Sequence, residues 1–341
     1  MKPILYDKNE SAFVSNGKGT LDFLTCRITE ERNGMFELEA TISELAYHAS
    51  EIEMNSFIKA QVPDQSDPQL FRVYKIKKSI TGQYVINAQH ISYQLNYIPA
   101  MPFVIEASEN ACQEALSGLK ANAVEQCPFT FATDVHVISS FELGTPVSIK
   151  NALGGMTGSI LDKYSGEYLW NNYTVTLKAQ RGKSPLEKDV TLRYGKDITD
   201  IEQEQYISNT VTGVVPFWQN TEQTRVITLP EKVVSSQYAS LYPFKRTIVY
   251  DCSQDFQDPP SEDELRTQAQ LYVNQNGIGI PTVSIKVKFI SLDEDIASRL
   301  QRVKLCDNIG VEFVKLGIST TAKVVKYVYD VLAERYDSIE V

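Results

Sequence analysis

The stretch Phe36-Glu37-Leu38-Glu39-Ala40-Thr41-Ile42-Ser43 alternates between apolar and polar residues. A period of two is typical of a strand that buries one face and leaves the other in solvent. Asn33-Gly34 before it is a turn signal, and Thr81-Gly82 separates two further β-rich segments, residues 70–80 and 83–95. Strands joined by short turns predict an antiparallel β-barrel domain over residues 1–98.

Residues 99–194 combine helical and strand patterns, which predicts a separate α+β lobe. Ser108 is a plausible N-cap for a helix with an apolar stripe of Ala111, Cys112, Ala115, Leu116 and Leu119. A second helix is expected to run from Ser148 to a stop at Gly166, with the stripe Leu153, Met156, Ile160, Leu161 and Tyr164. Its glycines Gly154, Gly155 and Gly158 suggest a close backbone approach. A hairpin is expected over residues 168–179.

Strand patterns resume after residue 194 and predict a second β-barrel domain over residues 195–248 and 302–341, with an α/β lobe inserted at 249–301. Within that lobe, Ser261 and Glu264 form a capping-box signature for a helix ending at Asn276-Gly277. An alternating strand is expected over residues 282–289. The fold class is therefore a multidomain β-rich α+β chain with two antiparallel β-barrel domains and two α/β lobes.

Charge and hydropathy exclude several classes of protein. The 341 residues carry a formal net charge of −10, which opposes a dedicated nucleic-acid binder. Charged residues interrupt the first ten positions and no apolar run reaches about 18 residues, so we expect neither an export signal nor a membrane span. We expect synthesis in a cytoplasm.

Metal and thiol chemistry find no support in the sequence. The five cysteines are odd in number and form no C-x-x-C pair, so we expect buried free thiols: Cys26, Cys112, Cys127, Cys252 and Cys306. The three histidines, His48, His90 and His136, lack zinc-hydrolase spacing, and His90 is expected to be a structural histidine. We predict no catalytic residue, no cofactor site and no metal site.

Three groups of charged residues are candidate sites. Glu37 and Glu39 point the same way from one strand about 6.5 to 7 Å apart, a spacing open to a glycosidase pair, although a solvated strand face explains them more simply. Two lysine groups are likewise expected to be solvated strand faces or protected edges, with a local anion contact as the alternative: Lys75, Lys77 and Lys78, and Lys286 and Lys288. The chain is also rich in aromatics, with 18 Tyr and 14 Phe, which favours a protein of assemblies over an enzyme.

Several motifs in order carry a family resemblance. They are residues 31–39, Phe71-Arg72-Val73-Tyr74-Lys75-Ile76, residues 88–95, Arg193-Tyr194-Gly195-Lys196-Asp197-Ile198, Tyr250-Asp251-Cys252-Ser253, residues 276–281, Leu305-Cys306-Asp307 and the closing segment from Val328 to Glu340. Together they resemble the siphophage tail-associated proteins labelled prophage tail endopeptidase. The resemblance covers nearly the whole chain.

The resemblance implies a tail-tip baseplate hub, similar to the trimeric hub of contractile-tailed phages, in which each subunit carries two barrels. It implies a homotrimer that joins the tail tube to the tip and lets DNA pass. The implied partners are the distal tail ring or tail tube protein, the tape measure protein and receptor-binding or baseplate proteins, with genomic DNA as passing cargo. The implied location is the virion tail tip.

The resemblance leaves alternatives open. Longer relatives continue beyond the segment equivalent to Asp337–Val341 into a peptidase, lysin or fibre-like region, so we expect this chain not to be an enzyme. A β-barrel host-surface or carbohydrate-binding module is the alternative. A cell-wall or protein hydrolase is the less favoured one, with Glu37 and His90 as its first candidate residues.

Overall fold

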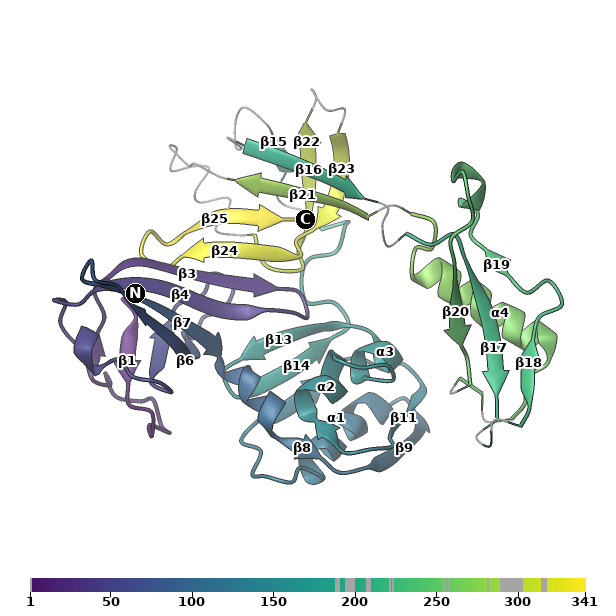
Figure 1. Ribbon diagram of the computed structural model, residues 1–341, viewed down its shortest axis with the longest axis horizontal. Helices are drawn as coiled ribbons and strands as arrows, with labels where there is room; N and C mark the ends of the chain where they lie inside the picture. The colour runs from purple at the N-terminus through teal and green to yellow at the C-terminus, as the bar shows by residue number, and fades with distance from the viewer. Residues whose placement is uncertain are drawn as a thin grey trace. The chain divides into compact units, whose positions relative to one another are not determined.

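The computed structural model describes residues 2–187, 191–193, 200–206, 210–220, 222, 224–253, 255–256, 258–280, 282–288, 303–313 and 318–341 (Figure 1). The chain forms two compact units. Unit 1 contains Met1–Ile201 and Lys286–Val341, and unit 2 contains Glu202–Ile285.

An eleven-stranded sheet, curled into a half-barrel, dominates the fold. Its order is β16-β21-β25-β24-β3-β4-β7-β6-β5-β1-β2. The strands are β1 (Ile4–Tyr6), β2 (Gly19–Thr20), β3 (Phe23–Glu31), β4 (Phe36–Ser43), β5 (Phe57–Ala60), β6 (Gln69–Lys78), β7 (Gln83–His90), β16 (Asp200–Tyr206), β21 (Thr282–Lys288), β24 (Lys326–Asp330) and β25 (Arg335–Glu340). The alternation predicted for β4 is confirmed, because its four apolar residues are buried.

The α+β part of unit 1 follows the short helices η1 (Ala49–Glu51) and η2 (Ile91–Tyr97). Its elements are β8 (Pro99–Ala100), β9 (Phe103–Ser108), α1 (Ala111–Ala121), β10 (Thr130–Thr133), β11 (Ser139–Leu143), β12 (Val147–Ser148), α2 (Ile149–Gly154), α3 (Ile160–Tyr164), β13 (Glu167–Asn171) and β14 (Thr174–Lys178). The stripe predicted for α1 is confirmed as its buried face, but the N-cap is Asn110 rather than Ser108. The predicted hairpin is β13–β14.

The single helix predicted after Ser148 is wrong, because the chain forms two short helices there. Ser148 caps α2 as expected, but α2 ends at the glycines and Ser159 caps α3 by accepting a hydrogen bond from the Asp162 amide. A Cβ on Gly154 would lie 2.6 Å from Leu161 Cδ1, so the close neighbour of this glycine is a side chain rather than the backbone that was expected.

The C-terminal strands, which were predicted to complete a second barrel, belong to two different sheets. β15 (Thr191–Arg193), β22 (Asn308–Phe313) and β23 (Ile318–Lys323) form a three-stranded sheet, whereas β24 pairs antiparallel with β3 in the large sheet. The two-barrel architecture and its domain boundaries stay predictions. Residues 194–199, 289–302 and 314–317, which include parts of the expected second barrel and inserted lobe, lie outside the described residues.

Unit 2 is a small sheet covered by one helix (Figure 1). β17 (Gly213–Gln219) pairs with β18 (Val226–Thr228), β19 (Val234–Ser235) and β20 (Thr247–Asp251), and the short helix η3 (Ala239–Leu241) lies between β19 and β20. α4 (Glu262–Gln275) begins at the predicted capping box of Ser261 and Glu264, which is confirmed. Its buried face packs with the sheet in a core that includes Val214, Leu229, Cys252, Leu265 and Ala269. Among the described residues, no helix is long and apolar enough to cross a membrane.

Candidate functional site

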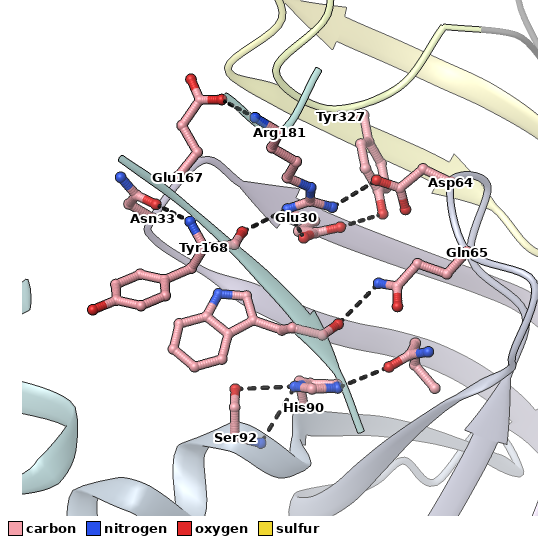
Figure 2. Close-up of polar contacts among 12 residues, drawn as sticks. Glu30, Asn33, Asp64, Gln65, His90, Ser92, Glu167, Tyr168, Arg181 and Tyr327 are labelled. Atoms are coloured by element: carbon pink, nitrogen blue, oxygen red, sulfur yellow. Dashed lines mark hydrogen bonds and ion pairs between the residues drawn. The ribbon is translucent and has the colours of Figure 1, made fainter. Parts of the chain in front are cut away.

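A buried polar cluster joins distant segments of unit 1 (Figure 2). Arg181 donates from Nη1 to Glu30 Oε1 at 2.8 Å and from Nη2 to Asp64 Oδ2 at 2.6 Å. Tyr327 donates its hydroxyl to Glu30 Oε2 at 2.7 Å. We call Glu30, Asp64, Arg181 and Tyr327 the Arg181 junction. It connects four parts of unit 1: strand β3, strand β24, the β5–β6 loop and the segment that follows β14.

The electrostatics of the Arg181 junction are those of a structural ion cluster. All four side chains are buried, and two carboxylates face one guanidinium. Burial raises the pKa of Glu30, although the nearby Arg181 charge acts in the opposite direction. Asp64 Oδ1 is buried with no hydrogen-bond partner among the described residues. Removing Arg181 would therefore leave two carboxylates buried and unpaired.

Further hydrogen bonds hold the β13–β14 hairpin against the large sheet (Figure 2). Asn33 Oδ1 accepts from the Tyr168 amide at 2.8 Å, and its Nδ2 donates to the Gly166 carbonyl at 3.0 Å. Gln65 Nε2 donates to the Trp170 carbonyl at 2.9 Å. These bonds fix the edge of the α+β part on the turns of the large sheet, so the two parts form one packed body within unit 1.

Glu167 adds an ion pair between the hairpin and the C-terminal part of unit 1. Its Oε1 lies 2.5 Å from Lys323 Nζ, and its Oε2 accepts from the Arg181 amide at 2.8 Å. The pKa of Glu167 is lowered, because the Lys323 and Arg181 contacts outweigh the opposing effect of burial.

His90 is a structural histidine, as predicted. Its ring stacks on Phe36 with centroids 4.4 Å apart and is fully buried. Nδ1 accepts from the Ser92 amide at 3.3 Å, so the proton lies on Nε2, which donates to Gln69 Oε1 at 3.2 Å (Figure 2). Burial, with a smaller effect of Lys150, keeps the pKa of His90 well below its usual value, and the ring is neutral.

Glu37 and Glu39 lie on the outward side of β4, as predicted. Glu37 accepts from the Tyr74 hydroxyl at 3.2 Å and from Gln89 Nε2 at 3.1 Å, and Glu39 accepts from Asn87 Nδ2 at 3.0 Å. Neutral donors on neighbouring strands thus hold both carboxylates. The prediction that neither is catalytic stays a prediction.

The remaining candidate residues have structural surroundings. All five cysteines are buried free thiols, as predicted, and burial raises the pKa of Cys112 and Cys127 and raises that of Cys252 and Cys306 to about 12. Lys75, Lys77 and Lys78 are exposed on β6, whereas the side chains of Lys286 and Lys288 lie outside the described residues. Within the described ranges, no group of three or more His, Cys, Asp or Glu residues could hold a metal ion.

The sequence interpretation missed the Arg181 junction. One signal was present, because Glu30 follows Cys26 and Ile28 at the inward positions of β3, where an apolar residue is expected. Asp64 and Arg181 lie in loops without a periodic pattern. Their pairing depends on the folded arrangement of segments that are far apart in the chain.

The fold is that of phage tail proteins. The structure aligns with prophage tail protein gp18 from Listeria monocytogenes (TM-score 0.64, 13% identity, 100% of this chain and 94% of that chain). It also aligns with the 43 kDa tail protein of prophage MuSo2 from Shewanella oneidensis (TM-score 0.63, 8% identity, 100% and 98%). A tail protein from Neisseria meningitidis aligns with a TM-score of 0.61 at 8% identity, over 99% of this chain and 95% of that one.

Sequence comparison points the same way. Residues 186–341 match the family model described as prophage endopeptidase tail, which confirms the resemblance for the motifs in that part of the chain. No curated protein matches the sequence.

Proposed function

We propose that this protein is a structural component of a bacteriophage or prophage tail, and that it forms a trimeric hub ring at the tail tip. The observation that carries the proposal is the fold, which aligns over the whole chain with the Listeria and Shewanella prophage tail proteins. The Arg181 junction of unit 1 suits this role, because it holds distant segments together in a body that can transmit mechanical load.

The hub would join the tail tube to the tip and let DNA pass. Its partners would be two further copies of itself, the distal tail ring or tail tube protein, the tape measure protein and receptor-binding or baseplate proteins. The net charge of −10 supports passage of DNA, because a negative lumen would not retain the phosphate backbone. The protein would be made in the bacterial host cytoplasm and reside at the virion tail tip.

We propose that the chain has a structural rather than an enzymatic role, despite the word endopeptidase in the family description. The residues first considered for hydrolysis support this assignment. His90 is buried and neutral, and its two ring nitrogens bond Ser92 and Gln69. Glu37 is held by Tyr74 and Gln89.

Light scattering after size exclusion, over a wide concentration range and with the tail tube protein added, tests the proposal. A species of three times 38.4 kDa that forms an annulus by electron microscopy is the expected result. A strict monomer that makes no ring even with the tube protein would overturn the hub. Binding of the isolated protein to host cells would then favour the host-surface or carbohydrate-binding module.

A further inference from the structure

A pocket of about 400 Å³ lies within unit 1, between β6, β7 and the helix η2. Its lining includes Asn55, Arg72, Tyr74, Gln89, Gln94 and Tyr97. Tyr97 is 81% exposed and Tyr74 is 40% exposed, so two aromatic rings stand at the surface of the pocket. Tyrosine and arginine are the residue types enriched at the energetic centres of protein interfaces.

Arg72 is the one cation that lines this pocket, and it is half-buried. Its guanidinium carbon lies 4.1 Å from the centroid of the Phe57 ring, and its Nη1 donates to the Asn55 carbonyl at 3.4 Å. Among the described residues, the Asn55 carbonyl is its hydrogen-bond acceptor, no carboxylate pairs with it, and the neutral side chain of Tyr173 lies near it. Burial lowers the pKa of Arg72, yet a guanidinium stays charged at any ordinary pH.

Glu37, which lies on the same face of the sheet as Arg72, already has hydrogen-bond donors of its own. Glu37, Gln89 and Arg72 are cross-strand neighbours on β4, β7 and β6, so Gln89 stands between the two charges. Two strand spacings separate the backbones of Glu37 and Arg72 by about 9.5 Å. Glu37 meanwhile accepts from Tyr74 and Gln89. Arg72 is therefore a partly desolvated cation that the fold leaves for an external anion.

We propose that this pocket binds the carboxylate of an acidic side chain on a neighbouring polypeptide. Arg72 would pair with that carboxylate, held in place by the Phe57 ring and the Asn55 carbonyl. Tyr74 and Tyr97 would pack on the aliphatic carbons of the incoming segment, and the Gln94 amide would bond its backbone. The choice of a polypeptide rests on the proposed function, since a tail component is surrounded by other proteins.

Titration of an octaglutamate peptide into the full chain, followed by calorimetry, tests this assignment. We expect Arg72→Gln to weaken binding tenfold or more and Tyr97→Ala to weaken it severalfold. Lys77→Gln is the matched control, because Lys77 is exposed on the same strand and does not line the pocket. An octaserine peptide should not bind. Circular dichroism of each variant establishes that it folds.

Three results would overturn the assignment. Equal affinity of Arg72→Gln and the parent would show that the pocket does not bind the peptide. Equal weakening by Lys77→Gln would show unspecific charge attraction. Binding of oligogalacturonate through Arg72 without binding of octaglutamate would assign the pocket to an acidic glycan. The test uses the isolated chain, so ring formation and peptide binding can fail separately.

Discussion

The hydroxyl of Tyr327 lies 2.7 Å from Glu30 Oε2, although 297 positions separate the two residues in the chain. The residues are directly opposite each other on β24 and β3, and both side chains are buried. This bond supplies one of the two partners of a fully buried carboxylate, and Arg181 supplies the other.

Replacement of Tyr327 by Phe should lower the free energy of unfolding by about 1–3 kcal/mol, because Glu30 loses a buried donor. Urea denaturation of the full chain measures the change. Tyr97→Phe is the matched control, since Tyr97 is exposed and should give an unchanged midpoint. A Tyr327→Phe midpoint equal to that of the control would show that the bond contributes no net stability.

Replacement of Arg181 by Met should lower the free energy of unfolding by about 3–5 kcal/mol, since it leaves Glu30 and Asp64 buried without their cation. Lys2→Met is the control, because Lys2 forms an exposed ion pair with Asp22 and such pairs contribute about 0–1 kcal/mol. Similar losses in both variants, again by urea denaturation, would contradict the importance of the Arg181 junction.

The loss in Arg181→Met should depend on pH. Burial raises the pKa of Glu30, and removal of Arg181 raises it further. A carboxyl whose pKa is higher in the folded than in the unfolded state makes the folded state more stable at low pH than at high pH. This stabilising contribution is complete below the unfolded pKa of about 4.3 and is lost as the pH rises through the folded pKa. The destabilisation should therefore be smaller at pH 5 than at pH 8. A loss that is independent of pH would show that Glu30 does not take up the proton.

Lys150 should titrate near neutral pH. Its Nζ lies 3.7 Å from the centroid of the Trp170 ring, and burial lowers its pKa to about 8. Unfolded lysine has a pKa of about 10.4, so between these values the unfolded chain binds more protons and stability rises with pH. Lys150→Met should remove this rise between pH 8 and 10, as measured by urea denaturation. An unchanged slope would place the Lys150 pKa at its ordinary value.

Ser261 should control the start of α4. Its side chain accepts from the Glu264 amide, and Glu264 bonds back to the Ser261 amide. Ser261→Ala should cost about 1 kcal/mol and speed amide hydrogen exchange in the first turn of α4. Ser261→Asp is the matched control, because aspartate keeps an acceptor at the N-cap and should retain the protection. Equal exchange in both variants would exclude a capping effect.

Local sequence patterns predicted much of the secondary structure. The alternation of β4, the buried stripe of α1 and the capping box of α4 each depend on residues within a few positions of one another. The same reasoning joined α2 and α3 into one helix, because the apolar stripe continues across the break. Ser159 ends that continuity, because its side chain accepts from the Asp162 amide and so caps a new helix, while the Leu161 side chain lies close to Gly154.

The long-range arrangement could not be predicted in this way. Nothing in residues 326–330 indicates that β24 pairs with β3 rather than with a nearer strand. The Arg181 junction is equally invisible, because its charges come from three loops or strands that meet only in the folded protein. The assignment of the pocket as a carboxylate site depends on Arg72 having no anionic partner. That can be seen only when the positions of the surrounding carboxylates in the folded protein are known.

The pairing of β24 with β3 has a consequence for biosynthesis. Once the strands up to β7 have been synthesised, most strands of the large sheet are present. One edge of β3 stays unpaired until β24, almost three hundred positions later in the chain, has been made. Until those residues emerge, the backbone groups on that edge are open to pairing with other nascent chains. Pairing of β24 with β3 is therefore expected to be a late event in the folding of unit 1, and a slow one because the contact is so distant in sequence.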